Sequence, residues 1–182
     1  MSESTTHSEW DFAKIQALVD GGIEERYDLE YKGAGTLRPK DKKTKDEIVK
    51  DVSAMANSAG GTIIYGIAEK NSPGSAPHAE KIDPVNLSVF SADTLDQVIQ
   101  SVQPKIDGVF ITPIEVPDSD GKALYVVSVP QSVTAHQARD KKYHKRRNTT
   151  TDAMEDYEIR DVMNRGTSPK IRVSFIFETF PD

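Results

Sequence analysis

Apolar residues recur three and four positions apart in four stretches of the chain, which is the spacing of one face of an α-helix. We therefore predict helices over residues 10–19, 44–59, 93–102 and 155–164. A pair of glycines follows each of the first two stretches, and glycine is common where a helix ends. The glycine pairs therefore predict where the first two helices end.

Other stretches alternate between apolar and polar residues or contain runs of β-branched residues, as strands do. These patterns predict strands over residues 27–31, 62–68, 109–116, 123–129, 142–145 and 171–177. The stretch 62–68 is a nearly continuous apolar run, which indicates an interior strand. The turn residues Pro117–Gly121 predict a hairpin between the two strands that they join. Because helices and strands are intermixed, we predict an α+β fold, with a mixed, mainly antiparallel sheet packed with helices.

The 182 residues, of which 36% are hydrophobic and 29% charged, have the size and composition of one folded domain. Cysteine is absent, which excludes disulfides, cysteine zinc sites and thiol catalysis. The sequence contains no apolar run of membrane-spanning length, and its first residues do not resemble a signal peptide. We therefore expect a soluble, cytoplasmic protein with no membrane partner.

The ends of the chain differ in composition from its centre. Residues 1–9 are polar, and we expect them to be disordered. A single domain is predicted at residues 10–166. Residues 167–182 start within a Gly-Thr-Ser-Pro segment and continue into an alternating stretch. This pattern predicts a linker and the first strand of a following domain, in which case the chain is part of a longer protein.

Positive charge is concentrated in two segments, although the net charge of the chain is −6. Residues 32–50 contain seven Lys and Arg against three acids, and residues 139–147 contain six against one. Cations interleaved with an aromatic residue suit a phosphate backbone with a stacked base. The predicted nucleic-acid contacts are Lys42, Lys43, Lys141, Lys142, Tyr143, Lys145, Arg146, Arg147, Asn148 and Thr149. The alternative is a solvated sheet edge protected by lysines.

Three glutamates stand close to two of the predicted strands. Glu25 precedes the strand at 27–31, Glu30 lies on the polar face of that strand, and Glu69 follows the strand at 62–68. If the two strands are neighbours, the three carboxylates converge at one edge of the sheet. Carboxylates so placed could hold Mg²⁺ or Mn²⁺, which would activate water. The alternative is that all three are ordinary solvent-facing acids.

Other catalytic patterns are missing from the sequence. The glycine pair Gly60-Gly61 follows a helix, and no Gly-Lys-Ser/Thr occurs, so a P-loop is excluded. The four histidines are scattered, without the spacing of a metal site or of a Ser-His-Asp triad.

Three segments occur in an order that resembles the Schlafen AlbA-like domain family. They are Glu25–Lys32 (ERYDLEYK), Ile48–Ile67 with its Ala-Asn-Ser-Ala-Gly-Gly centre, and Tyr143–Thr151. The resemblance covers about residues 12–165 and is most specific in the middle segment. It implies a single Schlafen AlbA-like domain. In bacteria such domains often begin longer proteins and are described as DNA-binding. In animal Schlafens the same core resembles an RNA endonuclease that cuts tRNA or rRNA with Mg²⁺ or Mn²⁺.

The resemblance also implies roles for individual residues. Glu25, Glu30 and Glu69 match the three carboxylates that hold the catalytic metal, and Lys32 matches a catalytic phosphate contact beside them. Because the animal core is a pair of such modules and this chain contains one, a complete groove would require a homodimer.

The sequence departs from the family pattern at several positions. Arg26 stands where the family usually has Ser, and Glu69 where many members have Asp. Arg146 matches the late arginine, and Asn148 replaces a glycine while keeping access to left-handed backbone. The zinc site of the animal proteins needs cysteines, so no zinc site is expected here.

Two functions follow as expectations. The first is a nucleic-acid-binding domain that acts as a metal-dependent endoribonuclease on tRNA or other structured RNA. The alternative is a non-catalytic DNA-binding or dimerisation module of a longer regulatory or ATP-binding protein. RNA and DNA both stay open as partners, because no local motif encodes contacts to the 2′-hydroxyl.

Overall fold

Capping side chains set where the helices begin. The computed structural model describes residues 10–166. In this part of the chain the helices are α1 (Phe12–Asp20), α2 (Lys42–Asn57), α3 (Ala92–Ile99) and α4 (Asp156–Met163), with a 3₁₀ turn η1 (Ala34–Thr36). They confirm the four predicted helices. α2 begins two residues before its predicted start because the Asp41 carboxylate accepts a hydrogen bond of 3.0 Å from the backbone N–H of Lys43.

Five strands form the central sheet. They are β1 (Leu29–Lys32), β2 (Gly60–Tyr65), β5 (Val85–Asn86), β6 (Phe110–Glu115) and β7 (Lys122–Pro130). The order is β1-β2-β7-β5. β2 and β5 pair with successive parts of one edge of β7, and β6 pairs with its opposite edge. β1 runs parallel to β2, whereas every other pairing in this sheet is antiparallel. The predicted mixed, mainly antiparallel sheet and the β6–β7 hairpin are therefore confirmed.

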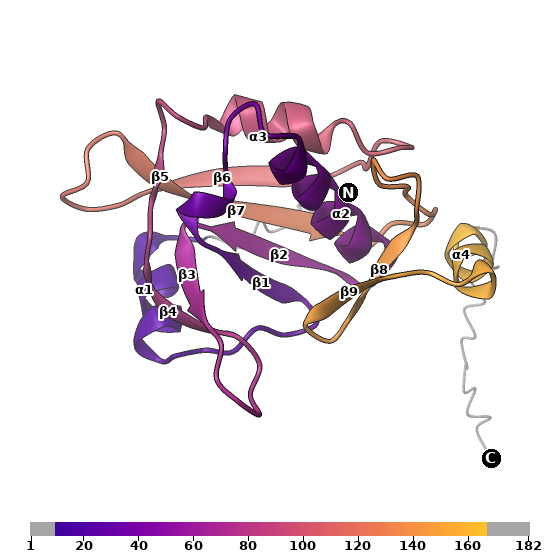
Figure 1. The fold of residues 1–182 in the computed structure, drawn as a ribbon, viewed down its shortest axis with the longest axis horizontal. Coiled ribbons are helices and arrows are strands. Elements are labelled where there is room, and N and C mark those ends of the chain that lie inside the picture. The colour runs from indigo at the N-terminus through magenta and orange to yellow at the C-terminus, as the bar shows by residue number, and fades with distance from the viewer. Residues whose placement is uncertain (1–9, 167–182) are drawn as a thin grey trace, which may run out of the picture.

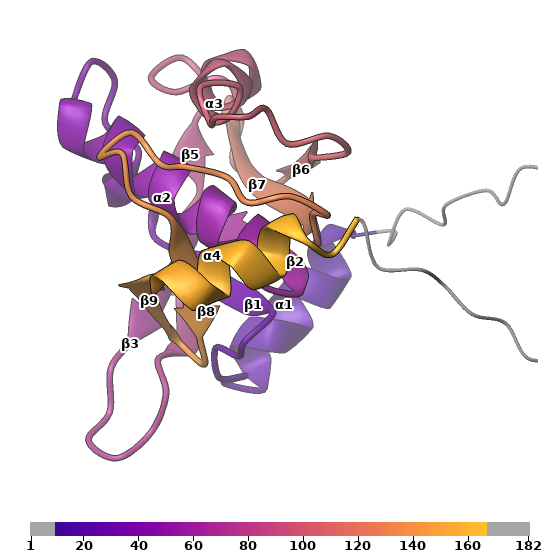
Figure 2. The same cartoon turned by 90° about the vertical axis from the view of Figure 1, so that its right-hand side faces the viewer.

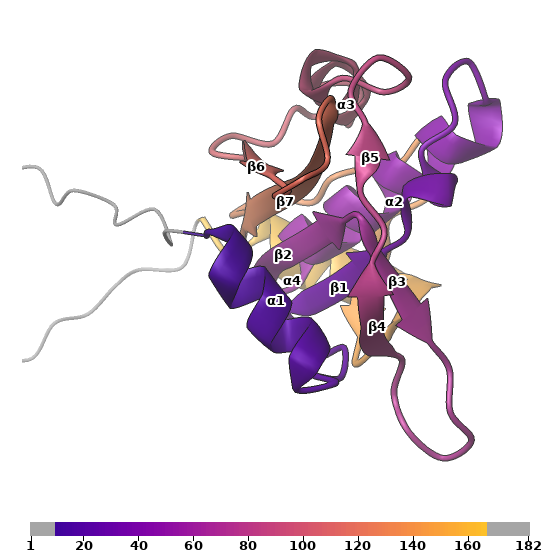
Figure 3. The same ribbon diagram turned by 90° about the vertical axis from the view of Figure 1, so that its left-hand side faces the viewer.

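Helices cover both faces of this sheet, as Figures 1 and 3 show. On one face α2 and α3 pack over an apolar cluster that includes Val52, Ile63 and Val127. On the other face α1 packs over a second cluster that includes Leu29, Tyr31 and Ile64. β1 is consequently covered on both sides, and its residue between Leu29 and Tyr31, Glu30, points into the protein rather than into water.

Gly66 divides the predicted strand at 62–68 into two. Its φ of 106° is open to glycine but strained for other residues, and a Cβ there would collide with the Leu124 side chain. After this break the chain forms β3 (Ile67–Lys70), which pairs with β4 (His78–Ile82) in a separate two-stranded sheet. Glu69 therefore lies on a different sheet from Glu30.

A long excursion from the end of β7 runs along α2 and back (Figure 2). The side chain of Asn57, at the end of α2, fixes both arms of the excursion. It donates hydrogen bonds to the backbone carbonyls of His136 (2.9 Å) and His144 (2.8 Å) and accepts one from the His136 N–H (2.7 Å). Further along, the Arg139 Nε lies 2.8 Å from the Asp46 Oδ1. These contacts, one near the start of α2 and the others at its end, hold the segment that carries the second basic run along the helix.

The returning arm forms a short hairpin of β8 (His144–Arg147) and β9 (Thr150–Ala153). Asn148 begins its turn with a φ of 56°, which confirms the left-handed backbone expected at this residue. α4 follows the hairpin and lies across it (Figure 2).

Some sequence-based expectations fall beyond the described part of the chain. The predicted disorder of residues 1–9, the predicted linker and the predicted strand at 171–177 all concern residues outside 10–166. Within that range no helix combines the length and the apolar character needed to cross a bilayer.

Candidate nucleic-acid interface

A buried ion cluster forms where β1, α2 and β8 meet. Glu30 is at its centre, since its two carboxylate oxygens face two different cations. Oε1 lies 2.5 Å from the Lys32 Nζ, and Oε2 accepts a hydrogen bond of 2.5 Å from the Arg146 Nη1. Arg146 is only 2% exposed, because the backbone of its strand is fixed to α2 by a hydrogen bond from its N–H to the Ser58 Oγ. Arg146, predicted as a nucleic-acid contact, is thus the buried counter-ion of Glu30.

Glu25 joins the same cluster from the turn before β1. Its Oε1 accepts a hydrogen bond of 2.9 Å from the backbone N–H of Tyr31, and its Oε2 lies 3.9 Å from the Arg146 Nη2. Burial raises the pKa of Glu25 to about 8; the Tyr31 N–H opposes this change and the charge of Glu30 adds to it. Burial thus makes the Glu25 carboxyl group harder to ionise than an exposed glutamate, although Arg146 opposes this effect.

Asp51 is a member of the cluster that the sequence analysis missed. It lies on α2, and its Oδ2 is 3.7 Å from the Lys32 Nζ. Burial raises the pKa of Asp51 to about 7, with the charge of Glu30 acting in the same direction and that of Lys32 against it. Burial alone would lower the pKa of Lys32, but the Asp51 and Glu30 carboxylates beside it raise that pKa above its usual value. Lys32 is therefore held as a cation between two carboxyl groups.

Glu69 does not complete a metal site in this arrangement. It is exposed on β3, beyond the break at Gly66, although its charge still acts on the pKa values of Glu25 and Lys32. Within residues 10–166 no group of three His, Cys, Asp or Glu side chains is placed so that it could hold a metal ion. Both oxygens of Glu30 already face cations. The residues as they stand therefore do not fit a bound Mg²⁺ or Mn²⁺.

The exposed cations gather along α2 and the neighbouring excursion. Lys42 and Lys43 are exposed in the first turn of α2, and Lys141 and Lys142 are exposed at the tip of the excursion. The Asp46–Arg139 ion pair joins these two places, which are far apart in the sequence. None of the four lysines makes a salt bridge within the described part of the chain. We call Lys42, Lys43, Lys141 and Lys142 the lysine face.

The β8–β9 hairpin presents its cations differently. Lys145 and Arg147 alternate with the buried His144 and Arg146, and both bond to Glu158 of α4. The Lys145 Nζ lies 2.7 Å from the Glu158 Oε1, and the Arg147 Nη2 lies 2.9 Å from it. Tyr143 and Thr149 are partly buried, and Asn148 is exposed in the turn. α4 is therefore attached to two of the predicted contact residues.

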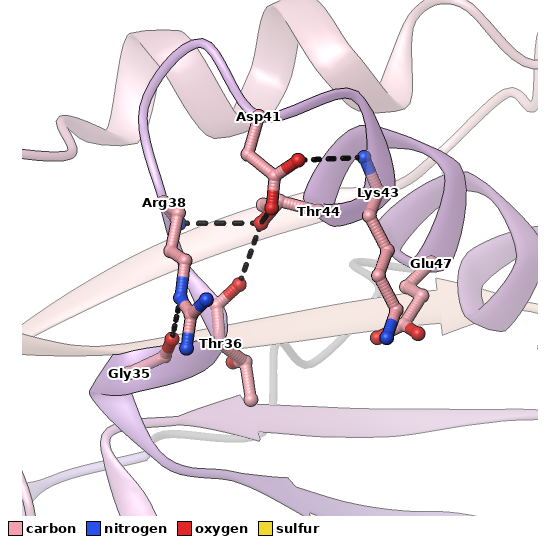
Figure 4. Close-up of a pocket in the computed structure, with 7 residues that line it drawn as sticks. All are labelled: Gly35, Thr36, Arg38, Asp41, Lys43, Thr44 and Glu47. Atoms are coloured by element: carbon pink, nitrogen blue, oxygen red, sulfur yellow. Dashed lines mark hydrogen bonds between the residues drawn. The ribbon is translucent and has the colours of Figure 1, made fainter.

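A hollow of about 170 Å³ lies at the start of α2 (Figure 4). Its cations, Arg38 and Lys43, are accompanied by the carboxylates of Asp41 and Glu47. Asp41 caps α2, and the Arg38 Nε donates to the Gly35 carbonyl. With two acids beside two bases, one of which is Lys43 of the lysine face, the hollow by itself is no concentrated anion site.

Comparison with known proteins identifies the family. A family model described as "Schlafen, AlbA_2" matches residues 25–155, which contain the buried cluster and the lysine face. The chain belongs to the Schlafen AlbA_2 family. This result confirms the resemblance inferred from the three sequence segments. No curated protein matches the sequence.

A solved structure shares the fold of this Schlafen AlbA_2 domain. The DIP2311 protein from Corynebacterium diphtheriae superimposes with a TM-score of 0.53 at 16% sequence identity, over 84% of this chain. The matched region is 31% of the DIP2311 chain, so this chain spans less than a third of that protein's length.

Proposed function

We propose that this Schlafen AlbA_2 domain binds nucleic acid through the lysine face. The observation that carries the proposal is the Asp46–Arg139 ion pair, which brings the start of α2 and the tip of the excursion together. The lysines on both segments are exposed and make no salt bridge within residues 10–166. A polyanion would therefore meet four neighbouring cations on a protein whose net charge is −6.

Binding to an oligonucleotide is expected to weaken as salt is added. Each neutralised phosphate releases counterions, so the slope of log K against log[salt] measures the number of contacts. We expect the variant Lys141→Ala/Lys142→Ala to bind more weakly and to reduce the magnitude of this slope by about two. Fluorescence anisotropy between about 50 and 200 mM salt measures both quantities.

The matched control is Lys122→Ala, because Lys122 is exposed at the start of β7, where it pairs with Asn86 of β5. It should bind like the unchanged protein. An affinity that does not change with salt, or an equal loss in both variants, would contradict the proposed interface.

A metal-dependent endoribonuclease activity is a second, separate proposal. It is supported by the convergence of Glu25, Glu30 and Lys32, which the family resemblance assigned to catalysis. The ion pairs that occupy Glu30 stand against it, since a cation would need those oxygens. We therefore derive no catalytic step from this arrangement.

Incubation of the protein with tRNA and Mn²⁺ tests the nuclease proposal. The variant to compare is Glu69→Gln, since Glu69 is exposed and its replacement leaves the buried ion pairs in place. The nuclease proposal requires cleavage by the unchanged protein and slower cleavage by the variant, because the family resemblance assigns Glu69 to the catalytic carboxylates. Equal cleavage by both proteins, or cleavage by neither, would reject the nuclease.

A further inference from the structure

A cleft between α4 and the body of the domain lies apart from the lysine face. Its volume is about 430 Å³, which exceeds that of the hollow at the start of α2 and lies within the range of small-ligand sites, about 300–1,000 Å³. The lining side chains come from the turn before β1, the end of α2, the β8–β9 hairpin and α4. Figure 2 shows α4 lying over the β8–β9 hairpin. Tyr157, Glu158, Asp161 and Val162 of α4 line the cleft.

Two tyrosines line the cleft from different elements. Tyr27 comes from the turn before β1 and is 41% exposed, and Tyr157 comes from the first turn of α4 and is 64% exposed. The alternation of residues 27–31 predicts that Tyr27 is buried, but β1 begins only at Leu29, and the turn leaves the Tyr27 ring accessible. Large aromatic rings that stay exposed beside a cleft are the groups on which nucleobases stack.

Cations lie beside these rings. Lys145 and Arg147 line the same cleft, and Glu158 holds both of them there. Arg147 is 44% exposed; its Nη2 donates to both Glu158 oxygens and its Nε lies 3.7 Å from the Asp152 Oδ2, so among the described residues its Nη1 is the nitrogen left for a phosphate. Arg165 closes the far end of the cleft, where it donates hydrogen bonds to the backbone carbonyls of Ser132 and Asn57. The cleft thus combines a fixed frame, two aromatic surfaces and donors for phosphate.

We propose that this cleft binds an unpaired nucleotide, with its base stacked on Tyr157 or Tyr27 and its phosphate beside Arg147 and Lys145. The inference rests on the proposed nucleic-acid binding and deepens it, because it assigns single-stranded rather than fully paired nucleic acid as the preferred partner. In a duplex the bases are stacked on one another and cannot reach the tyrosines, so the cleft would distinguish the two forms.

The test compares single-stranded and duplex oligonucleotides of equal length, as RNA and as DNA, by fluorescence anisotropy with the 182-residue protein. Tyr157→Ala is expected to weaken binding of the single strand about tenfold and to leave duplex binding unchanged. Tyr157→Phe keeps the stacking surface and should bind like the unchanged protein. Since Tyr157 is exposed and alanine favours helices, the Ala variant should keep its unfolding midpoint, which is measured alongside.

The outcomes separate this inference from the function on which it rests. If Tyr157→Ala binds the single strand normally while Lys141→Ala/Lys142→Ala binds weakly, the cleft assignment is rejected and the lysine face stands. Equal weakening for single strand and duplex would also reject the cleft assignment. If the unchanged protein binds no oligonucleotide at low salt, the proposed function itself fails. A loss in Tyr157→Ala confined to the single strand, with Phe restoring it, supports the cleft.

Discussion

Replacing Arg146 by alanine is expected to lower the free energy of unfolding by about 3–5 kcal/mol. The guanidinium is buried, and it faces the carboxylates of Glu30 and Glu25 at the junction of β1 and β8. Without it, Glu30 keeps Lys32 as a partner, but its second oxygen becomes a buried acceptor with no cation. The loss of stability comes mainly from burying this unsatisfied oxygen, and less from losing the attraction between Arg146 and Glu30. Urea unfolding of the 182-residue chain measures the change.

A surface arginine provides the comparison. Arg160 lies 2.8 Å from Asp156 on α4, but both side chains are about three-quarters exposed. Arg160→Ala should therefore change the unfolding free energy by about 1 kcal/mol or less. A second check is the double variant Glu30→Gln/Arg146→Met, which should lose less than the sum of its two single variants, because they act on one contact. Equal losses for Arg146→Ala and Arg160→Ala would show that the buried pair contributes nothing.

The stability of the domain is expected to reach its maximum at about pH 4 and to fall on both sides. On the acid side the responsible group is Glu158. The hydrogen bond from Lys145, helped by the Glu155 N–H and Arg147, lowers the pKa of Glu158 from 4.5 to about 2. The folded protein then binds fewer protons than the unfolded chain. The stability that Glu158 contributes is complete above pH 4.5 and is lost as the pH falls towards 2. Because its partners Lys145 and Arg147 are partly exposed, solvent screens this interaction, and the contribution is smaller than the whole pKa shift would give.

On the alkaline side two buried acids act in the opposite direction. The pKa of Glu25 is raised from 4.5 to about 8 and that of Asp51 from 3.8 to about 7, in both cases mainly by burial. The folded protein therefore binds more protons than the unfolded chain in these windows, so stability falls as the pH rises through them. Because both groups lie in one ion cluster with Lys32 and Arg146, their protons are released in successive steps whose apparent pKa values belong to the cluster and not to either residue.

Urea unfolding across this pH range measures both limbs. Glu158→Gln should remove most of the loss of unfolding free energy at acid pH. Glu25→Gln should make the decline of the unfolding free energy above pH 5 less steep. Stability that increases steadily from about pH 5 to 8 would contradict the raised pKa values of Glu25 and Asp51.

Much of the fold was predictable because local chemistry determines it. The turn at Pro117–Gly121 marked the β6–β7 hairpin, and Gly60-Gly61 marked the end of α2. The strands that were missed are short or polar: β4 reads His-Ala-Glu-Lys-Ile, β5 has two residues, and β9 reads Thr-Thr-Asp-Ala. Such strands form because a partner strand is present, not because of their own pattern. The break at Gly66 also depends on a distant residue, since Leu124 excludes a side chain there.

The site was predictable in part. The family resemblance placed Glu25, Glu30 and Lys32 together, and the structure brings them into one cluster. The burial of Arg146 was readable in principle, because strand alternation puts it on the same side as the buried His144. Asp51 also left a signal, since it stands among the apolar positions of α2, next to Val52. The sequence could not predict that each carboxylate oxygen of Glu30 already faces a cation, Lys32 or Arg146.

The position of Glu30 has a consequence for how the chain aligns as it folds. In the observed register Glu30 lies opposite Ile63 of β2, and its neighbours Leu29 and Tyr31 face α1. Because side chains alternate along a strand, a shift by one residue would place the Glu30 carboxylate in the apolar cluster beneath α1 and leave the buried Arg146 guanidinium without a partner on β1. The buried charge thus favours the observed register of β1 over registers shifted by one residue, which apolar packing alone would penalise less.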